Sequence, residues 1–148
     1  MSDLTDAELR ALPLGRLLLQ AHRRAQAASL AKLQASGHAE IRLGHVPVLT
    51  NLDPDGTRIT DLAARAGMTR QMTGRLVKEL ESLDYVRSRP HETDQRAVVV
   101  SLTERGERFL VEAPSAMAAV DRDFASLLGP ADLTHLREML LRIAEADS

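Results

Sequence analysis

Residues 60–103 constrain the fold of this chain more than any other stretch, because four short segments follow one another there in a telling order. Two segments with helical spacing come first, joined by a tight turn at Gly67. Two strand-like segments then flank a polar loop at residues 90–96. Such a helix pair presents its second helix to the major groove of DNA, and the hairpin adds a basic arm beside it. The stretch predicts a winged helix-turn-helix that binds DNA.

Each helix of the predicted pair has its own start and stop signals. Thr60 and Thr69 are expected N-caps, because a threonine hydroxyl accepts a hydrogen bond from a free backbone N–H at a helix start. Gly67 is expected to end the first helix in a left-handed conformation. The second helix should run to about Leu83 and face its partner with apolar side chains, namely Leu76, Val77, Leu80 and Leu83. Its outward side chains are polar or basic: Arg70, Gln71, Arg75 and Lys78.

The segments after the helix pair predict a wing and two long helices. Residues 85–89 and 97–102 are the expected strands. Thr103 should cap a long helix that Pro114 kinks, since proline removes one backbone hydrogen bond. Gly129 and the proline after it separate that helix from a last one. Apolar residues recur in a 3-4-3 pattern along both helices: Met117, Val120, Phe124, Leu127, Leu133, Leu136, Leu140 and Ile143.

The segments before the pair also predict helices. Residues 5–8 have capping-box spacing for a short helix. Pro13 suits the first turn of a longer helix that ends near residue 36. A further helix is expected over about residues 44–52, bent at Pro47. Proline and glycine within residues 53–56 predict a turn.

Composition agrees with a mainly helical fold of one domain. The chain has 148 residues, of which 44% are hydrophobic and only 2% aromatic, whereas strands favour aromatic and β-branched residues. The absence of cysteine excludes disulfides and thiolate catalysis. No apolar run is long enough to span a bilayer, and the acidic N-terminus is unlike a signal peptide. These features predict a cytoplasmic protein.

The charge is unevenly distributed. The formal net charge is −2, yet residues 58–96 carry eight basic and six acidic side chains, and residues 65–78 carry four basic side chains and no acidic one. A local basic footprint on a mildly acidic body suits site-selective DNA binding. On charge alone, a solvated helix face explains the pattern equally well.

Short motifs throughout this region point to one family. They are Leu62-Ala63, Gly67-Met68-Thr69, Arg75-Leu76-Val77, Glu79-Leu80-Glu81, Asp94-Gln95-Arg96 and Leu102-Thr103-Glu104-Arg105-Gly106. The chain resembles the MarR family of winged-helix transcriptional regulators. The most specific feature is the Asp-x-Arg wing motif followed by Leu-Thr-x-x-Gly. The resemblance implies a regulator that is not an enzyme, needs no cofactor and binds a palindromic operator as a homodimer.

The resemblance also implies an organisation. The whole of residues 1–148 is expected to form one domain, mainly α with a small β-hairpin wing. Residues 1–36 and 104–148 would supply long terminal dimerisation helices, and residues 44–103 would form the DNA-binding lobe. The family's known effectors imply a small, often aromatic and anionic ligand where the two parts meet. The sequence leaves the ligand-binding residues open. Arg16, His22 and His45 are candidates, and each is equally well explained as a surface residue.

Specific DNA contacts follow from the resemblance. It places the outward residues of the second helix in the major groove: Thr69, Arg70, Gln71, Gly74 and Arg75. Arg96 would enter the minor groove from the wing, braced by a salt bridge to Asp94. The remaining basic residues expected at the DNA are Lys78, Arg87 and Arg89. Arginine and glutamine can each form two hydrogen bonds with the edge of one base. Arginine also favours a narrow minor groove, and Thr69 at a helix start can bind phosphate.

Three positions depart from the family pattern. Gln95 stands where many members have a second arginine, which reduces the charge of the wing. Thr73 stands where an apolar residue is usual. Gly74 lies within the helix, where glycine costs about 0.5–1 kcal/mol relative to alanine. Gly74 is either tolerated drift or a point where the backbone comes close to DNA.

Other functions are less well supported. His22, His38, Glu40 and His45 are near one another in the sequence but lack the spacing of metal ligands on one helix, so we expect no metal site. Histidines that face solvent or line a ligand pocket are the simpler interpretation. No catalytic triad, phosphate loop or paired-carboxylate motif stands out. A winged helix used only for protein contacts would have an apolar or acidic outward face, and this one is basic.

Overall fold

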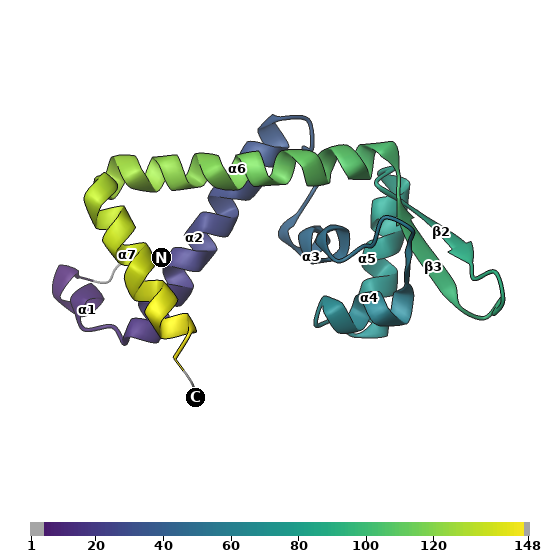
Figure 1. The fold of residues 1–148 in the computed structure, drawn as a ribbon, viewed down its shortest axis with the longest axis horizontal. Coiled ribbons are helices and arrows are strands. Elements are labelled where there is room, and N and C mark those ends of the chain that lie inside the picture. The colour runs from purple at the N-terminus through teal and green to yellow at the C-terminus, as the bar shows by residue number, and fades with distance from the viewer. Residues whose placement is uncertain (1–4, 147–148) are drawn as a thin grey trace.

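The computed structural model describes residues 5–146, and of residues 6 and 9 only the backbone. A helical arm and a winged lobe are joined by one long helix (Figure 1). The elements in chain order are α1 (Asp6–Arg10), α2 (Leu14–Ala35), the 3-10 helix η1 (Leu43–His45), α3 (Val46–Thr50), β1 (Thr57–Arg58), α4 (Ile59–Arg65), α5 (Arg70–Ser82), β2 (Val86–Pro90), β3 (Val98–Leu102), α6 (Glu104–Leu128) and α7 (Pro130–Ala144). The predicted fold class, mainly helical with a small β wing, is confirmed.

The arm consists of α2, α7 and the far end of α6. In Figure 1, α6 crosses α2, and α7 turns back from the end of α6 toward the start of α2. The predicted boundaries are confirmed here. Thr5 and Glu8 form the capping box, with the Thr5 N–H donating to Glu8 Oε2 at 2.7 Å. Pro13 directly precedes α2, and Gly129 separates α6 from α7.

Two predicted helix boundaries in the lobe are wrong. Thr60 does not cap α4, which begins one residue earlier at Ile59. The reason is a strand that the sequence did not indicate: β1 pairs with β3, with Arg58 opposite Val99, and the helix starts where this pairing ends. The sheet has the antiparallel order β1-β3-β2.

The helix expected over residues 44–52 is also corrected. It is divided into η1 and α3, and Pro47 lies in the first turn of α3. A proline is tolerated there because its missing N–H would have no helical partner, so Pro47 does not bend a longer helix. Pro114 does lie inside α6, but the helix is continuous from Glu104 to Leu128, and Figure 1 shows no sharp bend in it.

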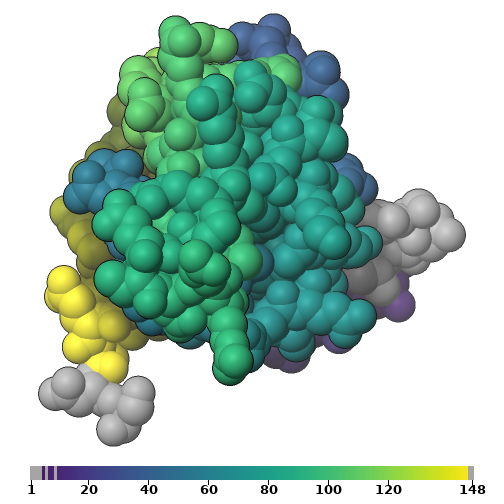
Figure 2. Space-filling view, turned by 90° about the vertical axis from the view of Figure 1, so that its right-hand side faces the viewer, coloured from purple at the N-terminus to yellow at the C-terminus, as the bar shows by residue number. Residues whose placement is uncertain are grey.

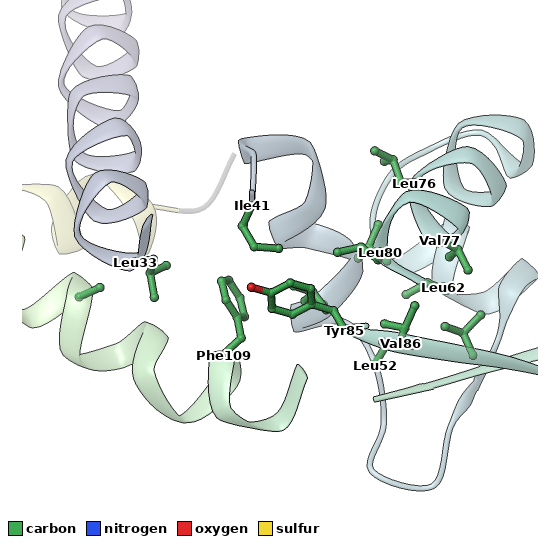
Figure 3. Packing of buried hydrophobic residues seen from close by; sticks show 14 residues of the cluster. Leu33, Ile41, Leu52, Leu62, Leu76, Val77, Leu80, Tyr85, Val86 and Phe109 are labelled. Atoms are coloured by element: carbon green, nitrogen blue, oxygen red, sulfur yellow. The ribbon is translucent and has the colours of Figure 1, made fainter. Parts of the chain in front are cut away.

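The main hydrophobic core lies where the arm meets the lobe. Figure 3 shows Leu33 of α2 and Phe109 of α6 on one side of Tyr85, and Leu62 and Leu80 of the helix pair on the other. The Tyr85 and Phe109 rings meet edge to face at 6.2 Å between centres. This core fixes the base of α6 to the lobe.

A glycine makes this junction close. A Cβ at Gly106 would lie 2.2 Å from the carbonyl oxygen of Tyr85, so only glycine allows α6 to approach the chain there. Thr103 caps α6 as predicted, its hydroxyl accepting from the Gly106 N–H at 3.2 Å. The Thr103 N–H donates to the Tyr85 carbonyl at 3.0 Å. The Leu-Thr-x-x-Gly motif therefore attaches the long helix to the lobe.

Polar contacts complete the junction. His38 is buried, with Nδ1 2.7 Å from the Tyr85 hydroxyl and Nε2 3.1 Å from Glu112 Oε2. The Arg105 guanidinium lies over the Tyr85 ring at 4.5 Å. Burial raises the pKa of Tyr85 above its ordinary value, and the nearby Arg105 offsets part of that rise. Arm and lobe are thus connected by bonded polar groups as well as by apolar packing.

Within residues 5–146, no helix is both long enough and apolar enough to cross a membrane.

Candidate nucleic-acid interface

The turn between α4 and α5 has the predicted geometry. Gly67 adopts a φ of +64°, a left-handed conformation in which glycine is unstrained. The Met68 N–H returns to the carbonyl of Ala63 at 2.9 Å, and Ala63 is buried between the helices. Thr69 caps α5, accepting from the Met72 N–H at 3.1 Å. The hydroxyl of Thr69 keeps its own proton for a further acceptor, such as a phosphate oxygen.

Helix α5 has one buried face and one outward face. The buried residues are Thr73, Leu76, Val77 and Leu80. Thr73, which departs from the family pattern, donates its hydroxyl to the Thr69 carbonyl at 2.9 Å and is 0% exposed. Thr73 therefore belongs to the core. Arg70, Gln71, Arg75 and Lys78 are all exposed, as predicted.

The outward residues differ in how they are held. Within residues 5–146, the side chains of Arg70, Gln71 and Lys78 form no hydrogen bond or ion pair. Arg75, by contrast, lies between two neighbours on its own helix. Its Nη2 donates to Met72 Sδ at 3.3 Å, and its Nη1 lies 3.9 Å from Glu79 Oε1. Arg75 is thus partly ordered before any ligand binds.

Glu79 is itself fixed by the core. His45 is 0% exposed, and its Nε2 lies 3.0 Å from Glu79 Oε2. The guanidinium of Arg42 bonds the same carboxylate. The hydrogen bond from His45, aided by the charges of Arg42 and Arg75, lowers the pKa of Glu79 below its ordinary value. An ionised carboxylate with a fixed position therefore stands beside Arg75.

The start of α5 and the wing lie next to each other. An open groove of about 390 Å³ is lined by Arg58, Arg70, Asp94 and Arg96 together with apolar residues of β3 and α4. Figure 2 views this end of the molecule, where the teal and green residues of α5 and the wing occupy one continuous face. Arg58 of β1, Arg70 of α5 and Arg96 of the wing loop therefore converge on a single groove beside the start of α5.

The predicted contact between Asp94 and Arg96 is corrected. Asp94 Oδ1 accepts the backbone N–H of Arg96 at 3.1 Å, and the guanidinium of Arg96 is not its partner. The Ala97 N–H also returns to the Asp94 carbonyl, at 3.0 Å. An aspartate followed two residues later by a donor N–H forms this local turn readily. Asp94 thus shapes the loop that carries Arg96, whose side chain remains exposed.

The two arginines of β2 are used differently. Arg87 and Arg89 are exposed and, two residues apart, lie on the same face of the strand. Arg89 is occupied within the lobe, with Nη2 3.5 Å from the Asp55 carbonyl and Nη1 3.8 Å from Glu92. The side chain of Arg87 forms no hydrogen bond or ion pair with the described residues. Arg87 is the freer of the two for a phosphate.

Gly74 has no structural reason within the chain. A Cβ there would meet no atom within 4 Å, and the backbone is ordinary α-helix. Neither packing nor an unusual φ requires glycine at this outward position. The structure is therefore consistent with both interpretations of Gly74, tolerated drift and a close approach of DNA.

Two residues of this face were missed by sequence reasoning. Arg58 reaches the groove from β1, a two-residue strand that exists only through its pairing with β3. Met72 is 43% exposed on α5, where helical spacing alone did not assign it to either face. The excess of basic over acidic side chains across residues 58–96 is the one sequence signal that included Arg58.

Comparison with known proteins gives the family. A sequence model of the MarR family matches residues 41–97, from just before η1 to the wing. The chain is 31% identical to AbsC, a MarR family transcriptional regulator from Streptomyces coelicolor, over 98% of this chain and 97% of AbsC, with a TM-score of 0.64. The chain belongs to the MarR family of transcriptional regulators.

Two further relatives agree. CouR, a transcriptional repressor whose structure contains a 23-mer DNA duplex, is 26% identical over 97% of this chain and 100% of its own, with a TM-score of 0.71. The transcriptional regulator TcaR from Staphylococcus aureus is 27% identical over 103 residues, 68% of each protein. This MarR family member is therefore a DNA-binding transcriptional regulator, and not an enzyme.

The histidines of this MarR family regulator do not form a metal cluster. Among the described residues, no group of three or more histidine and acidic side chains is placed to hold a metal ion. His38 and His45 are buried and bonded to glutamates, so neither faces solvent. The burial of His45 also removes it from the candidates for an open effector cleft. Arg16 and His22 are exposed on α2.

Proposed function

We propose that this MarR family regulator is a ligand-responsive repressor that binds a near-palindromic operator as a homodimer. The observation that carries the DNA contacts is the outward face of α5, where Arg70, Gln71 and Lys78 have no partner within the described chain. The opposite face of α5 is packed in the core. Unpaired basic and amide side chains held on such a helix are suited to binding phosphates and the edges of bases. The same basic face disfavours the alternative of a module that binds only proteins.

The proposed docking uses the residues expected from the sequence. Helix α5 lies in the major groove, where Arg75 and Gln71 read base edges and Thr69, Arg70 and Lys78 hold the backbone. Gly74 allows α5 to come close. The wing follows the adjacent backbone with Arg87 and Arg89, and Arg96 enters the minor groove. Asp94 acts by shaping the wing loop.

The surface area supports a homodimer. The protomer exposes 10387 Å², whereas a compact monomer of this length exposes about 7,500 Å². Figure 1 shows an elongated protomer, in which α7 and the first turns of α2 stand away from the lobe. Helix α7 buries no residue within the protomer, although Leu140 and Ile143 belong to its apolar pattern. A chain that leaves an apolar helix face uncovered gains stability by pairing it.

A second copy is the proposed cover for this face. The exposed large apolar residues of the arm are Leu14, Leu17, Leu19, Val111, Met117, Leu127, Leu128, Met139, Leu140, Leu141 and Ile143. They lie on α2, α6 and α7, which agrees with a division into dimerisation helices at residues 1–36 and 104–148 and a DNA-binding lobe at 44–103. Two lobes related by a twofold axis require half-sites about 10 bp apart.

The ligand response is proposed from the architecture and from the likeness to a repressor, CouR. Because α6 joins arm and lobe, a small aromatic or anionic effector bound near their junction can favour a spacing of the two lobes that misfits the operator. A tenfold loss of affinity requires only about 1.4 kcal/mol of differential binding. As a regulator acts where the genome is, we place the protein in the cytoplasm.

Mapping the DNA bound in cells tests the proposed function. Immunoprecipitated fragments should share a near-palindrome, and transcription next to it should rise when the protein is removed. An Arg75→Ala, Arg96→Ala double variant is the matched control and should lose those fragments while remaining folded. Enrichment without a shared sequence, or equal enrichment of the control, would contradict sequence-specific binding. Transcription that falls on removal of the protein would contradict repression.

A further inference from the structure

One residue of the recognition helix does not fit the chemistry around it. Met72 is 43% exposed in the first turn of α5, between the charged or polar side chains of Arg70, Gln71 and Arg75. Outside α2, α6 and α7, the exposed large apolar residues of the described chain are Leu43, Met72 and Val98. Only Met72 of these lies on the recognition helix.

The core does not account for this exposure. The inward face of α5 begins with Thr73 and continues with Leu76 and Val77, all of which are buried. Met72 precedes this face and leaves much of its side chain in solvent. Position 72 therefore offers an apolar surface within an otherwise charged or polar outward face of α5.

Met72 is also coupled to a base-reading residue. Its Sδ accepts from Arg75 Nη2 at 3.3 Å, because residues three apart on a helix lie side by side. Arg75 is held from its other side by Glu79 at 3.9 Å. The guanidinium of Arg75 and the thioether of Met72 therefore lie side by side on the outward surface of α5.

We infer that Met72 is a specificity-determining residue that packs on the C5-methyl group of a thymine next to the base bonded by Arg75. The inference rests on the proposed docking of α5 in the major groove. Thymine's methyl is the apolar group that the bases present in that groove. Methionine suits it, because its unbranched, polarisable side chain adapts to a partner's shape. Arg75 and Met72 together read a two-base step, one base by hydrogen bonds and the other by its methyl.

The test removes the methyl group alone. A tight-binding duplex is selected from a random library, and each thymine is then replaced by deoxyuridine at symmetric positions in both half-sites. Deoxyuridine keeps every hydrogen-bonding group of thymine. Affinities are measured by fluorescence anisotropy for the wild-type protein, for Met72→Ala and for Leu43→Ala, a control that removes an exposed apolar side chain elsewhere in the lobe.

At one thymine per half-site, wild-type affinity should fall about fourfold for each methyl removed, equivalent to about 0.8 kcal/mol. Met72→Ala should bind thymine and deoxyuridine duplexes equally at that position. Leu43→Ala should keep the wild-type sensitivity. Because Met72 is exposed, the melting temperature of Met72→Ala should stay close to that of the wild type, which separates a lost contact from misfolding.

Three outcomes would overturn the inference: a selected site without thymine in the half-sites, a wild-type protein indifferent to every deoxyuridine, or equal sensitivity in Met72→Ala. Arg75→Ala separates a failure of the proposed docking of α5 from a failure of the role given to Met72. If Arg75→Ala relaxes base preference while deoxyuridine has no effect, the docking stands and only the role of Met72 fails. If Arg75→Ala leaves all base preferences unchanged, both the proposed docking of α5 and the role of Met72 are wrong.

Discussion

His45 Nε2 lies 3.0 Å from Glu79 Oε2, and this contact joins a fully buried histidine to the recognition helix. The proton can be assigned. His45 Nδ1 accepts the Arg42 N–H at 3.2 Å, so Nε2 carries the hydrogen and donates it to the carboxylate. The Nε2–H of His45 thus holds the Glu79 carboxylate, and Glu79 stands beside Arg75. The position of one DNA-reading side chain depends in this way on a contact made in the core.

This contact predicts a pH dependence. The pKa of Glu79 is lowered in the folded protein, chiefly by the hydrogen bond from His45, from an ordinary value of 4.5. A group with a lowered folded pKa adds stability above its unfolded pKa and loses it as the pH falls through the folded value. Glu79→Gln should therefore be less stable than the wild type at pH 7, and the difference should shrink below pH 4.5.

Urea unfolding at pH 7 and at pH 4 measures this. Glu138→Gln, on the exposed polar side of α7, is the matched control and should behave as the wild type does. A difference between Glu79→Gln and wild type that stays constant or grows on acidification would contradict the assigned ionisation.

Arg75 and Arg87 should separate base reading from backbone binding. Arg75→Ala should cost about 1–3 kcal/mol and relax base preference at one position per half-site. Arg87→Ala should weaken binding nearly uniformly across sequences and reduce the salt slope by about one for each lost phosphate contact. Binding of each variant to a panel of single-base operator changes provides the measurement. Identical sequence profiles for both variants would be evidence against the roles given to them.

The wing predicts a difference between two aspartate variants. Because Asp94 accepts a backbone N–H, Asp94→Asn keeps an acceptor oxygen and should bind the operator nearly as the wild type does. Asp94→Ala should partly reproduce Arg96→Ala, whose loss of affinity should be concentrated on operators with A·T-rich flanks. If Asp94→Asn and Asp94→Ala are equally impaired, the charge of Asp94 matters more than its acceptor, and the loop geometry is not its role.

Gly74→Ala should make the protein more stable but weaken its binding to DNA. A Cβ at position 74 meets no atom within the chain, so Gly74→Ala should stabilise the protein by about 0.5–1 kcal/mol. If DNA comes close to this backbone, the same methyl group should weaken operator binding. Thermal unfolding and anisotropy titration of one preparation test both effects. Unchanged or stronger binding would make Gly74 a residue without a role at the interface.

The dimer predicts that one apolar position on α7 controls both assembly and DNA binding. Ile143 is 53% exposed in the protomer, so Ile143→Glu should leave the protomer folded but place a charge in the proposed interface. Arg142→Glu, on the polar side of the same helix, is the control. Sedimentation should give monomers for Ile143→Glu, dimers for the control, and loss of operator binding only for the former.

Deleting residues 130–148 should have the same consequence as Ile143→Glu, although every proposed DNA contact remains. A folded monomer that still binds its full palindrome tightly would contradict the interlocking arm.

Local signals predicted much of the fold. Thr69, Thr103 and Gly67 were correctly placed because caps and left-handed turns depend on a few consecutive residues. Thr60 was misplaced because β1 is defined by a strand some forty residues later in the chain. Long-range partners of this kind leave no local pattern.

The same limit applied to the site. The outward face of α5 followed from helical spacing, since its basic residues occur between apolar positions. The burial of His45 and His38 did not, because their glutamate partners lie 34 and 74 residues away. The contact between Asp94 and Arg96 was correctly paired but wrongly assigned to the side chains, as spacing alone does not choose between a guanidinium and a backbone N–H.

The central claim is that two recognition helices and wings of a dimer read DNA sequence, and a salt titration on two duplexes tests it most directly. Anisotropy is measured on the selected palindrome and on a scrambled duplex of equal length and composition, from low to moderate salt. The account predicts a preference of about a thousandfold or more for the palindrome. It also predicts that log affinity falls with log salt at a slope of about −5, as for six neutralised phosphates. Equal affinity for the two duplexes, or an affinity flat with salt, would contradict it.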